Sequence, residues 1–297
     1  MAENLTPESV KRTFYYHADA NPIGGTIDRP FSGFVPSHAS VSLPLVGGFI
    51  KKQRKGRKWK DIISYTSEST HVSGSKQDEP EGGPWTTQVS ATIEDLNILE
   101  IVTADKVVAQ LSVSHPHDGG SPTISLVGSQ FVNLRVSGVK IDPIIKYDLF
   151  ADHDGSAETD PAKRYPTHPW PRQEKFLAKV KEQYRNIRET FAERSKGEEI
   201  PDWFKPHFHR FDSAQGLDDR DYILCSLFDG IPNVPENFPG TVCGHGIRIP
   251  GFGKVFLGEV IVHQGTYTVS MIRAQLGSPV GGALSAAVAR SNGTHEP

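Results

Sequence analysis

The segment FKPHFHRFD, residues 204–212, holds side chains that bind metal ions readily. His207 and His209 are two positions apart, and Asp212 follows three positions later. Residues two apart on an extended backbone point to the same side, and imidazole and carboxylate groups are common ligands of zinc, iron and copper. The segment predicts half of a transition-metal site. The alternative is a polar surface loop, because histidines at this spacing also occur without a metal.

A second histidine pair could complete this site. His115 and His117 lie in SVSHPHDGG, at the end of an expected strand, so the two pairs would converge if the fold brings these segments together. Pro116 and Pro206 favour the alternative that both pairs lie in ordinary turns.

The segment KKQRKGRKWK, residues 51–60, is a concentrated positive charge. Its seven basic residues surround one tryptophan, and a tryptophan face can stack on a base or a sugar. A cluster of this kind can bind an anionic partner, whereas the alternative is a solvated loop whose charges protect an exposed sheet edge from aggregation. The candidate binding residues are Lys51, Lys52, Arg54, Lys55, Arg57, Lys58, Trp59 and Lys60.

Two other segments suggest chemistry more weakly. ADHDGSAETD, residues 151–160, has the oxygen donors of a calcium loop, but it lacks the glycine and the closing glutamate of an EF-hand. Cys243 and His245 could form a thiolate and imidazole pair, but a small buried cysteine is the simpler interpretation. The chain has no GxSxG, Walker A or HExxH motif.

The elements that would position these residues are mostly strands. Alternation of apolar and polar residues, with turn residues between the runs, predicts half-buried strands and a hairpin joined at residues 264–265. The expected strands lie within residues 41–49, 83–115, 123–138, 254–263 and 266–276.

One segment has the period of a helix. Apolar residues recur every three or four positions between Pro171 and Gly197, which suit a helix start and stop. The apolar stripe is Phe176, Val180, Tyr184, Ile187 and Phe191.

Together these elements predict a mainly β fold, an antiparallel sandwich or barrel with one long amphipathic helix in an insertion. We expect residues 1–147 and 223–279 to form one β domain with a shared core, interrupted by an insertion at 148–222. Residues 280–297 are small, polar and aperiodic, which predicts a flexible tail.

Composition limits the protein class. A chain of 297 residues can bury a large core without staples, and its two cysteines indicate neither a disulfide framework nor a cysteine-rich zinc module. No signal peptide or long apolar stretch is evident, so we expect a cytoplasmic protein without a membrane span. The net charge of −3 argues against general nucleic-acid coating.

The phrases LNILEIVTADKVVAQLSVSHP, GSQFVNLRVSG and FPGTVCGHGIRIPGFGKVFLGEV resemble those of uncharacterised bacterial β-rich proteins, over about half of the chain. The resemblance implies a bacterial β-rich single domain and carries no activity or catalytic residue.

Three functions remain open at this point. The first is a non-catalytic scaffold that binds a partner or self-assembles as a homo-oligomer, through the helix insertion or the basic segment. The second is a metal-dependent enzyme with its histidine site under the insertion. The third is a β-barrel that encloses a small apolar ligand.

Overall fold

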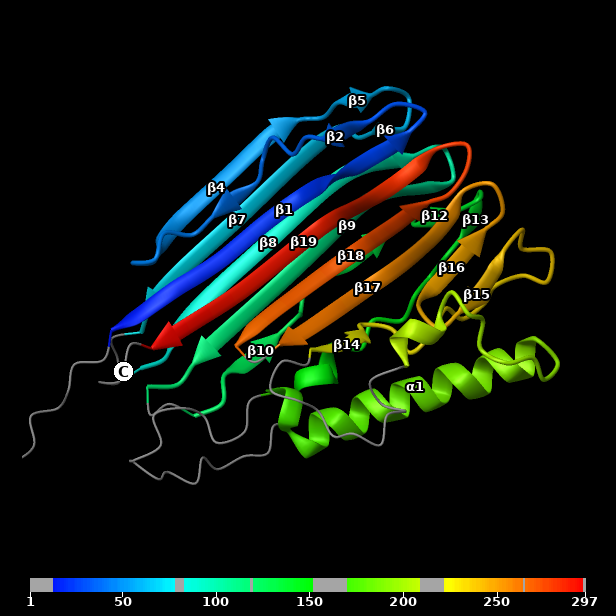
Figure 1. Ribbon diagram of the computed structural model, residues 1–297. Helices are drawn as coiled ribbons and strands as arrows, with labels where there is room; N and C mark the ends of the chain where they lie inside the picture. Colours follow the sequence, from blue (N-terminus) through cyan, green and yellow to red (C-terminus); the bar gives the residue numbers. More distant parts are fainter. Residues whose placement is uncertain are drawn as a thin grey trace, which may run out of the picture.

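The computed structural model describes residues 13–77, 83–117, 120–151, 170–208, 222–263 and 265–295. It consists of two antiparallel sheets that face each other, with a single long helix along one side (Figure 1). Over the described residues neither sheet closes on its first strand. The mainly β sandwich is therefore confirmed, and the barrel alternative is wrong.

The first sheet, sheet A, combines both ends of the chain. Its main order is β15-β16-β17-β18-β19-β1-β2, with β14 beside β17 and β3 beside β1. Strands from before residue 148 therefore pair with strands from after residue 222. The bounds are β1 Phe14–Arg29, β2 Gly33–Val35, β3 Val41–Ser42, β14 Ile223–Ser226, β15 Thr241–Cys243, β16 Gly246–Ile249, β17 Gly253–His263, β18 Thr266–Leu276 and β19 Gly281–His295.

The second sheet, sheet B, is built from one continuous stretch of chain. The long hairpin β8-β9 is its centre, and β7 and then β4 extend it on one side. β1 and β19 of sheet A pack on β8, which closes the core. The bounds are β4 Gly48–Lys55, β5 Lys58–Trp59, β6 Ile63–Ser64, β7 Ser67–Lys76, β8 Trp85–Ile98, β9 Val102–His115, β10 Thr123–Ser125, β11 Gln130–Val132, β12 Arg135–Val136 and β13 Val139–Lys140.

Most of the predicted strands are confirmed. The 83–115 segment forms β8 and β9, and the C-terminal hairpin forms β17 and β18. The single strand expected at 41–49 is wrong, because Pro44 to Gly47 make a turn between β3 and β4. The 123–138 run forms three short strands, each paired with β9.

The expected flexible tail is the clearest error. Residues 281–295 form β19, which pairs with β1 on one side and β18 on the other. Most of its buried positions carry small side chains, and the alternation of buried and exposed residues changes phase at Ala287, whose φ is +49°. Leu284 and Ala286 are buried before this residue, and Ala289 and Ser291 after it. This phase change hides the period of two that identifies a strand.

The phase change extends across the sheet. Pro22, Met271 and Gly258 lie at the level of Ala287 on β1, β18 and β17, because the residue pairs on either side keep one register. We call these four residues the inversion row. Each strand turns its side chains to the opposite face there, so residues three apart across the row share a face.

The helix α1, Glu174–Arg194, confirms the predicted amphipathic element, with all five residues of its apolar stripe buried. It packs on the segment from β14 to Ile231, where the Gln183 amide donates to the carbonyls of Ser226 and Phe228 and accepts from the Ser226 N–H. Short 3-10 helices flank it: η1 Tyr147–Phe150, η2 Trp170–Arg172 and η3 Lys205–His207.

Because β19 lies between β1 and β18, a chain ending at Pro279 is expected not to fold. Circular dichroism and a thermal melt would show no cooperative transition, whereas a chain ending at residue 295 retains every paired strand and should melt like the full chain. A normal melt of the 1–279 chain would contradict the assigned role of β19.

Candidate metal centre

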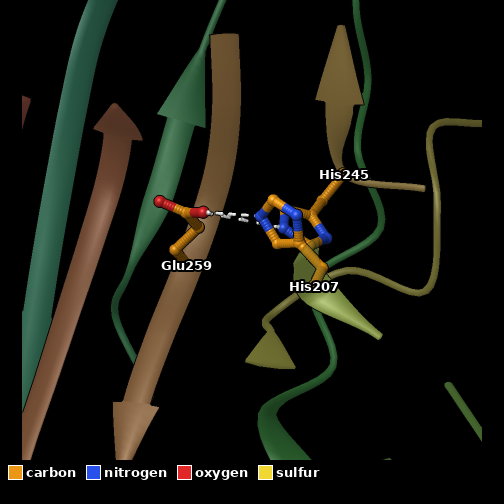
Figure 2. A group of neighbouring side chains, drawn as sticks. All are labelled: His207, His245 and Glu259. Atoms are coloured by element: carbon orange, nitrogen blue, oxygen red, sulfur yellow. Dashed lines mark hydrogen bonds and ion pairs between the residues drawn. The ribbon is translucent and has the colours of Figure 1, made fainter. Parts of the chain in front are cut away.

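Three buried side chains meet on the face of sheet A that η3 covers. His207 comes from η3, His245 from the turn between β15 and β16, and Glu259 from β17 (Figure 2). One possible ligand atom from each residue lies within 4.8 Å of the others. Among the described residues this is the one group of three or more histidine, cysteine or acidic side chains close enough to share an ion.

Aromatic packing fixes His207. Its ring stacks on Phe204, with centroids 4.4 Å apart, and on Phe256 of β17 at 4.9 Å. Phe204 is itself fully buried. η3 therefore reaches the sheet through a packed aromatic contact rather than through a surface loop.

Two glycines hold His245 in place. A Cβ on Gly244, whose φ is +55°, would lie 2.8 Å from Ile187 of α1, and a Cβ on Gly246 would lie 2.9 Å from Phe204. The turn thus fits tightly between the helix and η3, and the imidazole between these glycines is completely buried.

The inversion row places Glu259. Gly258 has a φ of +58°, and a Cβ there would lie 2.5 Å from the Phe228 ring, so this position requires glycine. The phase change brings Glu259 to the same face as Phe256, although the two residues are three apart. Its carboxylate therefore points under η3 rather than into the core between the sheets.

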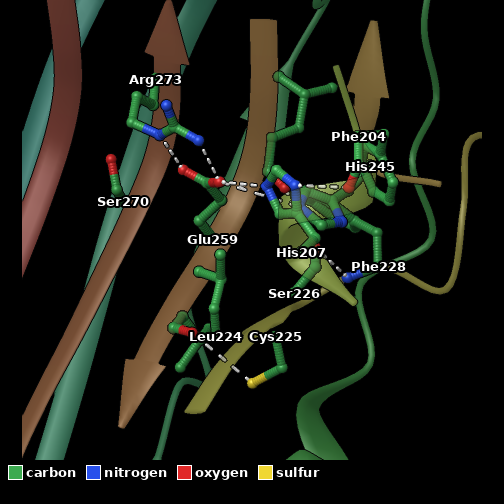
Figure 3. A network of polar contacts seen from close by, with 12 residues as sticks. Phe204, His207, Leu224, Cys225, Ser226, Phe228, His245, Glu259, Ser270 and Arg273 are labelled. Atoms are coloured by element: carbon green, nitrogen blue, oxygen red, sulfur yellow. Dashed lines mark hydrogen bonds and ion pairs between the residues drawn. The ribbon is translucent and has the colours of Figure 1, made fainter. Parts of the chain in front are cut away.

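Arg273 of β18 neutralises this carboxylate. Its Nε donates to Oε2 of Glu259 and its Nη2 donates to Oε1 at 2.6 Å, a two-pronged ion pair (Figure 3). The guanidinium also lies 4.1 Å from the centre of the Phe256 ring. Burial alone raises the pKa of Glu259, but the hydrogen bonds from Arg273 and His207 outweigh this effect and lower the pKa to about 2.

His207 faces an acceptor on each side. Its Nδ1 lies 3.1 Å from the Phe204 carbonyl oxygen, and its Nε2 lies 3.2 Å from Glu259 Oε1. A neutral imidazole has one N–H and can donate to only one of them. Two states satisfy both contacts: an imidazolium, or a neutral ring whose Nε2 and Glu259 share a cation.

His245 has no hydrogen-bond partner for either ring nitrogen, and its Nε2 lies 3.9 Å from Glu259 Oε1. A buried polar group without a partner costs about 1–3 kcal/mol. Burial lowers the pKa of His245 to about 3, an effect that nearby Glu259 opposes and that His207 and Arg273 reinforce. The ring is therefore neutral at physiological pH, with a lone pair free to bind a metal.

The predicted metal ligands divide into three groups. His207 is in the cluster. His209 and Asp212 lie outside the described residues, so their part in a site stays a prediction. His115 and His117 are not members of the cluster: His115 packs on Phe14 and His117 stacks on Trp85.

Most of the basic segment 51–60 lies in two separate strands rather than in a loop. Residues 51–55 belong to β4, which pairs only with β7 among the described residues, and Lys58 and Trp59 form β5. Trp59 is half-buried against Phe31, with the Lys60 ammonium nearby. The ring of Trp59 thus makes an edge-on contact with Phe31. An anionic partner at these strands stays a prediction, and the unpaired edge of β4 fits the edge-protecting role among the described residues.

The weaker sequence candidates fare differently. Most of the calcium-loop segment, from Asp152 onwards, lies outside the described residues. Burial raises the pKa of Cys243 to about 12, so its thiol is not a ready nucleophile.

Sequence reasoning missed Glu259 and Arg273 and gave His245 only a role beside Cys243. The available signal was a charged residue inside each of two otherwise apolar strands, VFLGEVIV and VSMIRAQL. Such charges are rarely buried without a partner.

The fold and the site define a two-sheet antiparallel β-sandwich with a buried cluster of two histidines and one glutamate. The chain belongs to the family described as Domain of unknown function (DUF8256), whose model matches residues 14–263. The matched range includes the three cluster residues but ends before Arg273. Comparisons with curated proteins and with solved structures gave no match. Within the described residues, no helix has the length and apolarity needed to cross a membrane.

The buried neutral His245 gives a pH prediction. In metal-free buffer containing a chelator, His245 of the unfolded chain binds a proton below pH 6.5, whereas His245 of the folded chain binds one only near pH 3. The buried neutral ring therefore does not lower the free energy of unfolding above pH 6.5. Below pH 6.5 it lowers this free energy by about 1.4 kcal/mol per pH unit, until the folded chain also binds the proton near pH 3. Urea unfolding of wild type and His245→Leu should show a difference in free energy that changes by this slope between pH 6 and 4. Parallel pH curves would contradict it.

Proposed function

We propose that this protein binds a divalent transition-metal ion, zinc first among them, through His207, His245 and Glu259. The observation that carries the proposal is the fully buried His245 imidazole, which has no hydrogen-bond partner and lies beside a second imidazole and a carboxylate. Two imidazole nitrogens and one carboxylate oxygen are a known zinc ligand set.

The contacts of His207 support the same proposal. Its Nδ1–H can donate to the Phe204 carbonyl, and this hydrogen bond would direct the Nε2 lone pair towards Glu259. Metal-binding histidines commonly have such a carbonyl partner on the second ring nitrogen, because it fixes the tautomer and the ring orientation. The ion would then take the place of an imidazolium proton at Nε2.

The proposed role of the ion is structural. His207 belongs to the insertion, whereas His245 and Glu259 belong to sheet A. An ion shared by them would fasten the insertion to the sheet, and its binding free energy would add to the stability of this contact. The burial of all three side chains favours a held ion over one that exchanges substrates.

This proposal takes the non-catalytic scaffold from one function that the sequence leaves open and the metal site from another. The broader proposal is a non-catalytic scaffold, which the bound ion would stabilise. Catalysis by this centre, self-assembly as a homo-oligomer and an anionic partner at the basic strands stay predictions, as do the bacterial origin and the cytoplasmic location.

The proposal predicts about one zinc per chain and a zinc-dependent rise in melting temperature. Elemental analysis and thermal melts would compare the full chain after zinc loading and after chelation. His207→Ala and His245→Ala should each bind at least about tenfold more weakly than wild type, because each removes one of three ligands.

The matched control is His17→Ala, which removes an exposed histidine of β1 outside the cluster. It should bind zinc as wild type does. Equal zinc content and equal melting shifts in wild type and in both ligand variants would overturn the proposal, since the bound metal would then lie elsewhere.

A further inference from the structure

Arg273 has a second consequence for the cluster. Its side chain contacts both oxygens of Glu259 and the face of Phe256. Phe256 in turn stacks on His207. The guanidinium is therefore held beside the proposed metal site by two groups, the Phe256 ring and the Glu259 carboxylate, and the carboxylate would be a ligand. Figure 3 shows Arg273 against Glu259.

The Oε1 atom of Glu259 is the point of conflict. It accepts the 2.6 Å hydrogen bond from Arg273 Nη2, and it is also the oxygen that faces His207 at 3.2 Å and His245 at 3.9 Å. An ion bound between the two imidazoles would use this same oxygen. A divalent ion and a guanidinium on one buried oxygen repel each other, and the low dielectric of the interior strengthens the repulsion.

We infer that Arg273 is a built-in competitor of the metal ion, which occupies Glu259 in the metal-free protein and keeps binding at this site reversible. The inference rests on the proposed function. Without an ion, the arginine pairs the buried carboxylate, so that the metal-free chain folds without an uncompensated charge. With an ion, Arg273 gives up Oε1 and keeps Oε2.

The competition also explains how the metal-free chain can fold although the proposed role of the ion is structural. A structural zinc site is usually closed by its ligands, and small domains built around one are unfolded without the metal. Here the side chain of Arg273 is 31% exposed, whereas that of Glu259 is 4% exposed. The arginine thus joins the buried carboxylate to solvent and can move away from it without unfolding the sheet.

The test is the zinc affinity of the full chain, measured by competition with a chromogenic chelator. Arg273→Gln removes the charge and should bind zinc at least about tenfold more tightly than wild type, while its metal-free form melts at a lower temperature. Arg248→Gln is the matched control, because it removes an exposed arginine from neighbouring β16. Its zinc affinity should equal that of wild type.

Arg273→Lys keeps the test valid if Arg273→Gln does not fold. A lysine retains the charge but cannot grip both oxygens in a fork, so it should bind zinc about threefold more tightly than wild type. Unchanged or weaker zinc binding in both variants would overturn the inference.

The wild-type protein offers an independent readout. Phenylglyoxal modifies accessible arginines, and peptide mass spectrometry can follow each site. Zinc should increase the rate at which Arg273 is modified, because one of its two hydrogen bonds to Glu259 is lost. The rate at Arg248 should not change. An equal or slower rate at Arg273 in zinc would count against the inference.

The failures of the two proposals are distinguishable. If wild type binds zinc through His207 and His245 but the Arg273 variants bind no more tightly, the competitor role fails and the metal site stands. If wild type binds weakly and Arg273→Gln binds one zinc per chain, both stand. If neither binds zinc, both fail.

Discussion

The cluster depends on one constraint, that a carboxylate buried in a β-sandwich must be compensated. Glu259 is almost completely buried, and an unpaired charge there would cost several kcal/mol. The chain meets this cost with Arg273 from the neighbouring strand and His207 from the insertion. The aromatic stack holds η3, and with it His207, over the Glu259 carboxylate. The helix α1 packs beside the turn that carries His245.

Backbone geometry makes this arrangement possible. A regular strand would send every second side chain of β17 towards sheet B. The inversion row changes the phase in four strands at one level, so sheet A keeps a continuous apolar core on one face and places Glu259 on the other. The same local irregularity thus supports both the packing and the site.

The predictability of the structure from sequence follows the strength of local periodicity. Long regular patterns predict two half-buried strands within residues 83–115, which are β8 and β9, and an amphipathic helix between Pro171 and Gly197, which is α1. The turn between β8 and β9 is not predicted. β19 was missed because Ala287 shifts its phase and because small residues give weak contrast between its faces. The cluster could be predicted only in part, from His207, since His245, Glu259 and Arg273 are brought together by strand pairing that no local pattern specifies.

The place of β19 has a consequence for biosynthesis. β19 is made after both of its neighbours and is inserted between β1 and the β17-β18 hairpin, with Phe14 paired to His295. Sheet B is continuous in sequence and can form early, but β1 gains its long partner only after residues 281–295 have been made. Contacts so distant in sequence slow folding, and until then the open edge of β1 is a surface that chaperones would have to shield.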